Sequence, residues 1–124
     1  MNDAEALQFT RRHIETWNSH DLDAIVALYA ETIELVSPVA AALRGSAEVR
    51  GLKDLREYFA QGLTKYPDLR FDLVHTFLCE SSVTIVYYGP VGKLAAEVML
   101  LGKDRKIERV YAHYVCVPSD KSVS

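Results

Sequence analysis

The chain has 124 residues, 49% hydrophobic and 25% charged, so we expect a single globular domain over residues 1–124. Its formal net charge of −3, without a block of like charges, excludes the concentrated basic surface that nucleic-acid binding needs. No apolar run reaches the ~18 residues of a membrane span, and the first residues do not read as a signal peptide. We therefore expect a cytoplasmic protein with no nucleic-acid or membrane partner.

The first elements along the chain are two helices separated by a tight break. Apolar residues at helical spacing predict a helix over residues 3–18, with Asp3 as its N-cap. Asn18-Ser19-His20 interrupts the pattern, and Asp21 is placed to cap a second helix whose apolar side extends to Tyr29. Such a short break predicts two helices packed at an angle on a common surface.

After the second helix, the spacing of the apolar residues becomes mainly that of strands. A short strand at Ile33–Val36 ends at Ser37-Pro38, residues 39–50 have no single period, and a third helix is expected from about Leu52 to Tyr66. Four consecutive strands with short turns follow, which predicts an antiparallel meander. The whole is an α+β domain, with three helices packed on a curved, mainly antiparallel sheet. The expected strands cover residues 70–79, 82–88, 94–101 and 107–117, and residues 118–124 are expected to form a flexible tail.

Cysteine and histidine positions do not indicate a metal site. Cys79 and Cys116 lie in apolar strand-like runs, which favours buried, reduced thiols over a disulfide. The four histidines have no ligand spacing, and no glycine-rich phosphate loop is present. We therefore expect no metal and no cofactor.

Four stretches of the sequence carry a resemblance to a known family: His13-Ile14-Glu15, Asp21 to Ala30 (DLDAIVALYA), Ser37-Pro38, and Leu55 to Leu63 (LREYFAQGL). With this order of elements they resemble the SnoaL-like branch of the nuclear-transport-factor-2-like (NTF2-like) superfamily. The N-terminal half is similar to bacterial ketosteroid isomerases. The resemblance implies a cone-shaped fold with an apolar cavity between helices and sheet. The superfamily holds isomerases, cyclases, dehydratases, epoxide hydrolases and non-enzymatic binding domains, so the fold alone does not choose an activity.

The similarity to ketosteroid isomerases implies a role for each matching position. Their chemistry combines a carboxylate base with an oxyanion hole made by a tyrosine and a neutral carboxylic acid. The oxyanion tyrosine falls on His13, the supporting helix tyrosine on Tyr29, and the neutral acid on Glu97. The base falls on Ser37, whose hydroxyl cannot take a proton from carbon without an activating partner. Glu34 points to the opposite face of the same strand, so a standard ketosteroid isomerase is not expected.

Glu97 is the only charged residue of its strand, LAAEVMLL, so its carboxyl is expected in a dry or water-filled pocket. With His13 it forms the expected catalytic pair of a cofactor-free isomerase, cyclase or dehydratase that acts on a hydrophobic cyclic substrate. The alternative is a non-catalytic ligand-binding or dimeric assembly module, in which Glu97 pairs with a cation such as Arg109 and core side chains fill the cavity. An epoxide-hydrolase-like site needs an Asp-Arg-Asp set, which Asp72, Asp104 and Arg109 do not obviously supply.

The two faces of the last strand lead to different expectations. One face lines the cavity, and the other carries Arg109, Tyr111 and His113, a mixture that suits contact with another protein. Family members commonly dimerise through this outer face, so the resemblance implies a homodimer. A shift of one residue in the strand makes His113 an alternative catalytic residue. The expected substrate-binding residues, mainly apolar or aromatic, are Trp17, Tyr29, Ser37, Tyr58, Phe59, Leu63, Met99, Ala112 and Tyr114.

Overall fold

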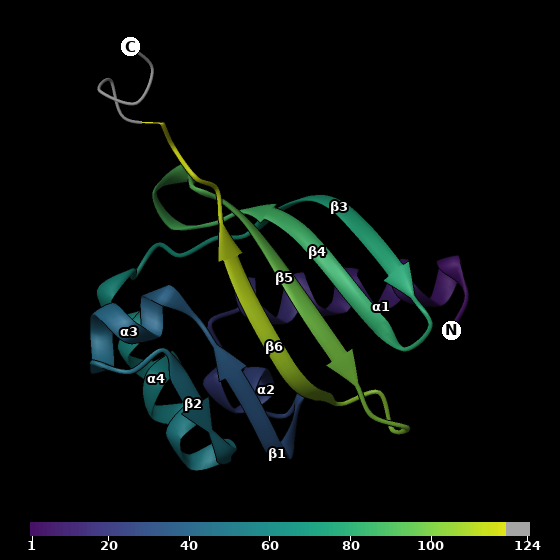
Figure 1. Ribbon diagram of the computed structural model, residues 1–124, viewed down its shortest axis with the longest axis horizontal. Helices are drawn as coiled ribbons and strands as arrows, with labels where there is room; N and C mark the ends of the chain where they lie inside the picture. The colour runs from purple at the N-terminus through teal and green to yellow at the C-terminus, as the bar shows by residue number, and fades with distance from the viewer. Residues whose placement is uncertain (119–124) are drawn as a thin grey trace.

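Polar capping residues begin the first two helices of the computed structural model, which describes residues 1–118 (Figure 1). The Asn2 side chain accepts a hydrogen bond from the Glu5 N–H, and the Glu5 carboxylate accepts one from the Asn2 N–H. This capping box replaces the expected cap at Asp3, whereas Asp21 caps the second helix as expected. The helices are α1 (Asp3–Asn18), α2 (Leu22–Val26), α3 (Pro38–Arg44) and α4 (Gly51–Lys65).

The second helix is shorter than the sequence pattern predicted. Helix α2 ends at Val26, and Tyr29 begins strand β1 (Tyr29–Val36) instead of closing the helix. The Leu28 carbonyl already accepts a hydrogen bond from the Ile107 N–H at 3.0 Å, so sheet pairing takes over from the helix at this point. Tyr29 is buried, as expected, but a strand and not a helix positions it.

The segment after β1 contains two elements that the expected order lacked. Ser37 caps α3 by accepting a hydrogen bond from the Val39 N–H, and Pro38 occupies the first turn, where its missing N–H costs little. Gly45 ends this helix with a φ of 81°, in the left-handed region that glycine tolerates. The three-residue strand β2 then pairs antiparallel with β1. The described residues thus contain four α-helices, not the three expected.

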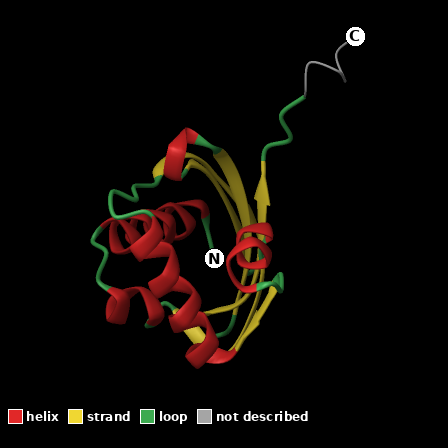
Figure 2. Ribbon diagram, turned by 90° about the vertical axis from the view of Figure 1, so that its left-hand side faces the viewer, coloured by secondary structure: helices red, strands yellow, loops and turns green. Residues whose placement is uncertain are grey.

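The sheet has the strand order β2-β1-β6-β5-β4-β3. Within residues 1–118 its only parallel pair is β1–β6, and the expected meander of β3 to β6 is antiparallel throughout. Figure 2 shows the sheet as a curved layer with helices packed on its inner side. The α+β class with a curved, mainly antiparallel sheet is confirmed. The remaining elements are β2 (Glu48–Arg50), β3 (Asp72–Cys79), β4 (Ser82–Tyr88), the short 3-10 helix η1 (Pro90–Gly92), β5 (Leu94–Leu101) and β6 (Ile107–Tyr114).

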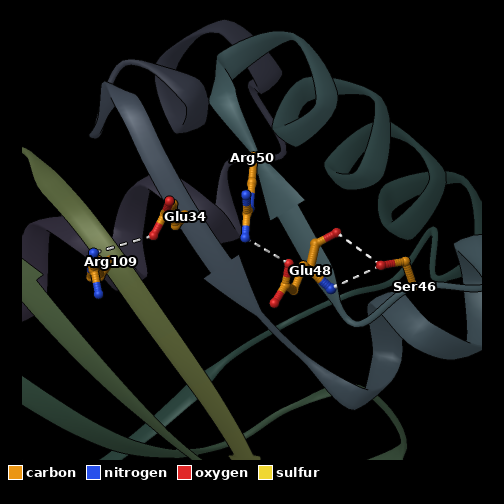
Figure 3. Close-up of polar contacts among 5 residues, drawn as sticks. All are labelled: Glu34, Ser46, Glu48, Arg50 and Arg109. Carbon is orange, nitrogen blue, oxygen red and sulfur yellow. Dashed lines mark hydrogen bonds and ion pairs between the residues drawn. The ribbon is translucent and has the colours of Figure 1, made fainter.

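The outer side of the sheet carries exposed ion pairs. Arg109 of β6 lies 3.4 Å from the Glu34 carboxylate of β1, and Arg50 lies 3.0 Å from the Glu48 carboxylate on β2 (Figure 3). Solvated pairs of this kind contribute little to stability. They show instead that Arg109 and Glu34 point away from the core. The inner face of β6 carries Val110, Ala112 and Tyr114, and the outer face carries Arg109, Tyr111 and His113.

The cysteine prediction is half right. Cys79 and Cys116 are both free thiols, but both are exposed and not buried. Cys79 is the last residue of β3, an outermost strand of the sheet, and Cys116 follows the end of β6. These two positions, at a strand end and after one, leave the thiols exposed. An apolar local sequence therefore did not ensure burial here.

Two further expectations concern the chain as a whole. No helix within residues 1–118 is long and apolar enough to cross a membrane. The same residues contain no group of three or more His, Cys, Asp or Glu side chains that could hold a metal ion. The tail expected at residues 118–124 lies, after Pro118, outside the described part of the chain.

Candidate functional site

A cavity of about 450 Å³ lies between the helices and the inner face of the sheet. Residues of α1, α3 and α4 form one side of it, and residues of β1, β4, β5 and β6 form the other. Its size is that of a small-molecule site, and its wall is mainly apolar and aromatic. The aromatic wall residues are Trp17, Tyr29, Tyr58, Phe59, Tyr66, Phe71, Tyr87 and Tyr114.

Most of the side chains expected to bind a substrate lie on this wall. Met99 does not, because it is 0% exposed and packs in the core at the β6-paired position of Val110. Leu63 also lies off the wall and packs against the core from α4. The expected residues that do line the cavity are Trp17, Tyr29, Ser37, Tyr58, Phe59, Ala112 and Tyr114.

Glu97 lines the cavity from β5 and has one hydrogen-bond partner among the described residues. The Tyr87 hydroxyl donates to Glu97 Oε1 at 2.5 Å from the neighbouring strand β4. Burial raises the pKa of Glu97, and the hydrogen bond from Tyr87 offsets part of that rise because it stabilises the carboxylate. Arg109, the cation expected as an alternative partner, is on the outer face with Glu34. The carboxyl is therefore shifted toward its neutral form, which suits proton exchange near neutral pH.

Three more wall tyrosines lie within electrostatic reach of Glu97. Burial raises the pKa of Tyr29, Tyr58 and Tyr114, and the charge of Glu97 raises each further. Their hydroxyls therefore stay protonated and can donate hydrogen bonds. The Tyr29 hydroxyl already accepts a hydrogen bond from Trp17 Nε1 at 3.3 Å, which leaves its own proton available for another acceptor.

Ser37 stands at the strand end where the resemblance places a catalytic base. It is 1% exposed, and its Oγ accepts hydrogen bonds from the Val39 N–H at 3.1 Å and from the Tyr58 hydroxyl at 3.4 Å. Neither partner can take the serine proton, so Ser37 is not activated as a base. The same hydroxyl offsets part of the raised pKa of Tyr58 and Tyr114. Ser37 Oγ accepts both of these hydrogen bonds, which leaves its own proton available to donate to a substrate oxygen.

His13 is buried behind the cavity and does not line it. Its side chain is 1% exposed, and its ring packs against Phe9 and Tyr29, with ring centres 6.2 and 6.3 Å away. Within the described residues neither ring nitrogen has a hydrogen-bond partner. Burial lowers the pKa of His13 to about 4, so the ring is neutral at pH 7. Within the described residues no hydrogen bond joins His13 to Glu97, and only Glu97 of the expected pair lines the cavity.

The sequence pattern missed Tyr87, although the signal for it was present. In the strand SVTIVYY, alternation places Tyr87 on the same face as Val83 and Ile85, which are buried. Antiparallel pairing sets Tyr87 opposite Ala95 and Ile85 opposite Glu97, so the Tyr87 and Glu97 side chains are diagonal neighbours on one face. This register is what a single sequence could not fix.

Three structural expectations tied to the alternatives do not fit the geometry. Trp17, Tyr58 and Phe59 surround the cavity without filling it. Asp72, Asp104 and Arg109 are absent from the wall, so they do not form a water-binding Asp-Arg-Asp set. His113 is exposed on the outer face, so the shifted register that made it a catalytic candidate is wrong.

The sequence matches the SnoaL-like domain model over residues 10–115. The chain belongs to the SnoaL-like family. A SnoaL-like protein of unknown function from Burkholderia thailandensis is 39% identical, with a TM-score of 0.88 over 94% of this chain and 99% of that one. The resemblance to SnoaL-like proteins is thereby confirmed. An NTF2-like protein from Cytophaga hutchinsonii, 13% identical with a TM-score of 0.69 over 89% of each chain, shares the fold. No curated protein shows significant similarity to the sequence.

Two solved structures of lower identity share the fold. The epoxide hydrolase/cyclase-like enzyme SalBIII, described in pyran ring formation in salinomycin, is 20% identical, with a TM-score of 0.74 over 92% of this chain and 93% of its own. A candidate polyketide cyclase from Sinorhizobium meliloti is 10% identical, with a TM-score of 0.71 over 91% of this chain and 100% of its own. At these identities the likeness shows the fold and leaves the activity of this SnoaL-like chain open.

Proposed function

We propose that this protein binds a hydrophobic cyclic small molecule in its cavity and catalyses an isomerisation, cyclisation or dehydration by acid–base chemistry without a cofactor. The supporting observation is the Glu97 carboxyl, which stands on an apolar wall with a raised pKa and, among residues 1–118, Tyr87 as its one hydrogen-bond partner. Such a group exchanges protons more readily near neutral pH than a solvated carboxylate, because its two forms are closer in population.

Glu97 provides both proton-transfer steps of an isomerisation. Its carboxylate takes a proton from a carbon next to a substrate carbonyl, and the electron pair of that C–H bond moves into the enolate. The carboxylic acid that results then returns the proton to a different carbon, so no atom is gained or lost. In a dehydration or ring closure the acid form instead protonates the oxygen that leaves or opens.

We expect the wall hydroxyls to stabilise the negative charge that forms on the substrate oxygen. Tyr58 and Ser37 are hydrogen-bonded to each other, and Tyr114 has a raised pKa in the same region of the wall. Preorganised donors in an apolar cavity stabilise a developing oxyanion more strongly than water does. This arrangement supports a division of labour, with Glu97 moving the proton and the hydroxyls holding the oxygen.

Deuterium exchange into a cyclic ketone tests the proton-transfer step without knowledge of the natural substrate. Proton NMR in D₂O follows loss of the acidic C–H signals of 2-tetralone with and without the protein. Wild type is expected to accelerate exchange, and Glu97→Gln is expected to lose about a hundredfold or more of that acceleration. Glu57→Gln, at an exposed position of α4, is the matched control and is expected to exchange at the wild-type rate.

The same assay separates the catalytic and non-catalytic alternatives. Equal rates for wild type and Glu97→Gln contradict the role of Glu97. No acceleration by wild type, together with a thermal shift when 2-tetralone binds, favours the non-catalytic binding module. The catalytic role expected for His13 stays a prediction, and the rate of His13→Leu in this assay tests it.

We also propose that two copies of the chain associate through the outer face of the sheet. Tyr111 on β6 is paired with Val98 on β5, and Phe77 on β3 is exposed on the same sheet. Arg109 and His113 border Tyr111 with polar groups, the mixture that protein interfaces commonly show. A self-complementary face of this kind fits a two-fold dimer.

A further inference from the structure

Two lysines line the cavity wall from separate segments of the chain. Lys65 is the last residue of α4, and Lys93 directly follows η1. Both line the cavity while their side chains remain exposed, so they lie where the cavity meets solvent. Strand β5 begins just after Lys93, and its Ala95 lies opposite Tyr114, the last residue of β6.

Each lysine ammonium lies over the ring of a wall tyrosine. Lys65 Nζ is 5.6 Å from the centre of the Tyr66 ring, and Lys93 Nζ is 5.5 Å from the centre of the Tyr114 ring. These distances are typical of cation–π contacts. Tyr66 and Tyr114, like the two lysines, line the same cavity. Two positive charges therefore lie at the exposed part of one cavity.

Neither ammonium is neutralised by a carboxylate within residues 1–118. The ion pairs of the described residues all involve arginines. Among the described residues, the Lys, Arg, Asp and Glu side chains that line the cavity are Lys65, Lys93 and Glu97. Burial raises the pKa of Glu97, which favours its uncharged form. The cavity mouth is thus positive on a chain whose formal net charge is −3.

We infer that the ligand is an amphipathic acid, with its ring system in the apolar cavity and an anionic group between Lys65 and Lys93 at the mouth. This inference rests on the proposed binding of a cyclic molecule but does not depend on catalysis. Solvated ammonium groups add little affinity, so their main effect is selectivity and orientation. An acid held at the mouth presents the opposite end of its ring system to Glu97.

Two fluorescent probes with the same rings test the inference. One is 8-anilinonaphthalene-1-sulfonate, and the other is N-phenyl-1-naphthylamine, which lacks the sulfonate. The double variant Lys65→Gln/Lys93→Gln is expected to bind the sulfonate about fivefold to tenfold more weakly than wild type, with unchanged affinity for the neutral probe. Lys53→Gln, an exposed lysine of α4 away from the wall, is the matched control and is expected to bind both probes like wild type.

Two further measurements test the same inference, one at higher salt and one with a variant whose cavity is blocked. Raising the salt from about 50 mM to about 500 mM is expected to weaken binding of the sulfonate and not of the neutral probe. Ala112→Phe places a ring in the cavity beside Glu97 and is expected to weaken both probes. Thermal melts of each variant confirm folding, and the single lysine variants, each expected to show part of the loss, serve if the double variant is unstable.

The outcomes separate this inference from the proposed function. Equal sulfonate affinity in wild type and the double lysine variant overturns the acidic ligand, while neutral-probe binding that Ala112→Phe weakens leaves the binding function in place. Sulfonate binding that Ala112→Phe does not weaken places that probe elsewhere and also overturns the inference. Failure of wild type to bind either probe overturns both proposals.

Discussion

Replacing His13 by leucine is expected to flatten the dependence of protein stability on acid pH. The ring is enclosed between Phe9 and Tyr29, and neither nitrogen has a hydrogen-bond partner in the described residues. Burial lowers the pKa of His13 to about 4 from an ordinary value of 6.5. Protonation therefore favours the unfolded chain, in which water solvates the charged ring.

The pKa gap sets both the sign and the size of the effect. Above pH 6.5 the ring is neutral in both states, and its contribution to stability is fully present. Between pH 6.5 and about 4 the unfolded chain binds a proton that the folded protein does not, so stability falls as pH falls. At about 1.4 kcal/mol per pKa unit, the loss is about 3 kcal/mol, a large share of the 5–15 kcal/mol that typically holds a domain folded.

Urea unfolding followed by Trp17 fluorescence measures this difference between about pH 7.5 and about pH 4. Wild type is expected to lose about 3 kcal/mol more than His13→Leu over that range, because the other titrating groups are common to both proteins. His75→Gln, which alters an exposed histidine, is the control and is expected to follow wild type. If His13→Leu loses as much stability as wild type, the buried ring does not carry the acid sensitivity.

Four further predictions follow from local contacts. Glu97→Gln is expected to gain stability relative to wild type as pH rises above 4.5, because a group with a raised folded pKa loses its contribution as pH increases; a pH-independent difference in urea unfolding contradicts this. Tyr87→Phe is expected to raise the pKa of Glu97 further, and an unchanged carboxyl titration by carbon-13 NMR refutes it. Asn2→Ala is expected to cost about 1 kcal/mol in urea unfolding by opening the capping box, and an unchanged midpoint shows that the box is dispensable. Tyr111→Glu is expected to convert a dimer into a monomer by light scattering, and a monomeric wild type removes the dimer proposal.

Elements with strong local signals could be predicted closely from the sequence. Strands over residues 82–88 and 94–101 have the predicted bounds, because alternating β-formers end at turns with their own chemistry. Strand β2 and helix α3 could not be placed in the same way. Helix α3 has only seven residues, and the three residues of β2 are held by pairing with β1, a contact that no local period encodes. Tyr29 was assigned to the wrong element, because a hydrogen bond from the Ile107 N–H to the Leu28 carbonyl already pairs the chain with the sheet at the residue before it.

The candidate site shows the same limit in three dimensions. Periodicity separates the two faces of a strand, and the resemblance indicated which face lines the cavity; Glu97, Ala112 and Tyr114 do line it. Periodicity does not say how far along that face the cavity extends. Met99 lies two residues after Glu97 on the same face of β5, yet its side chain packs in the core. His13 lies on the same stripe of α1 as Trp17, yet it does not line the cavity. Depth along a face depends on packing between distant segments.

The polar groups of this cavity are arranged in the reverse sense to those implied by the resemblance to ketosteroid isomerases. The resemblance puts the base of that family at Ser37, whose hydroxyl accepts a hydrogen bond from Tyr58, and puts its neutral oxyanion acid at Glu97. Within the described wall Glu97 is the one carboxyl, so a proton can be taken from carbon only on the β5 side. A substrate that uses both groups must therefore bind with its reacting C–H bond toward Glu97 and its oxygen toward Ser37. Lysines at the mouth favour one end of an acidic ligand over the other, and that preference selects between the two orientations.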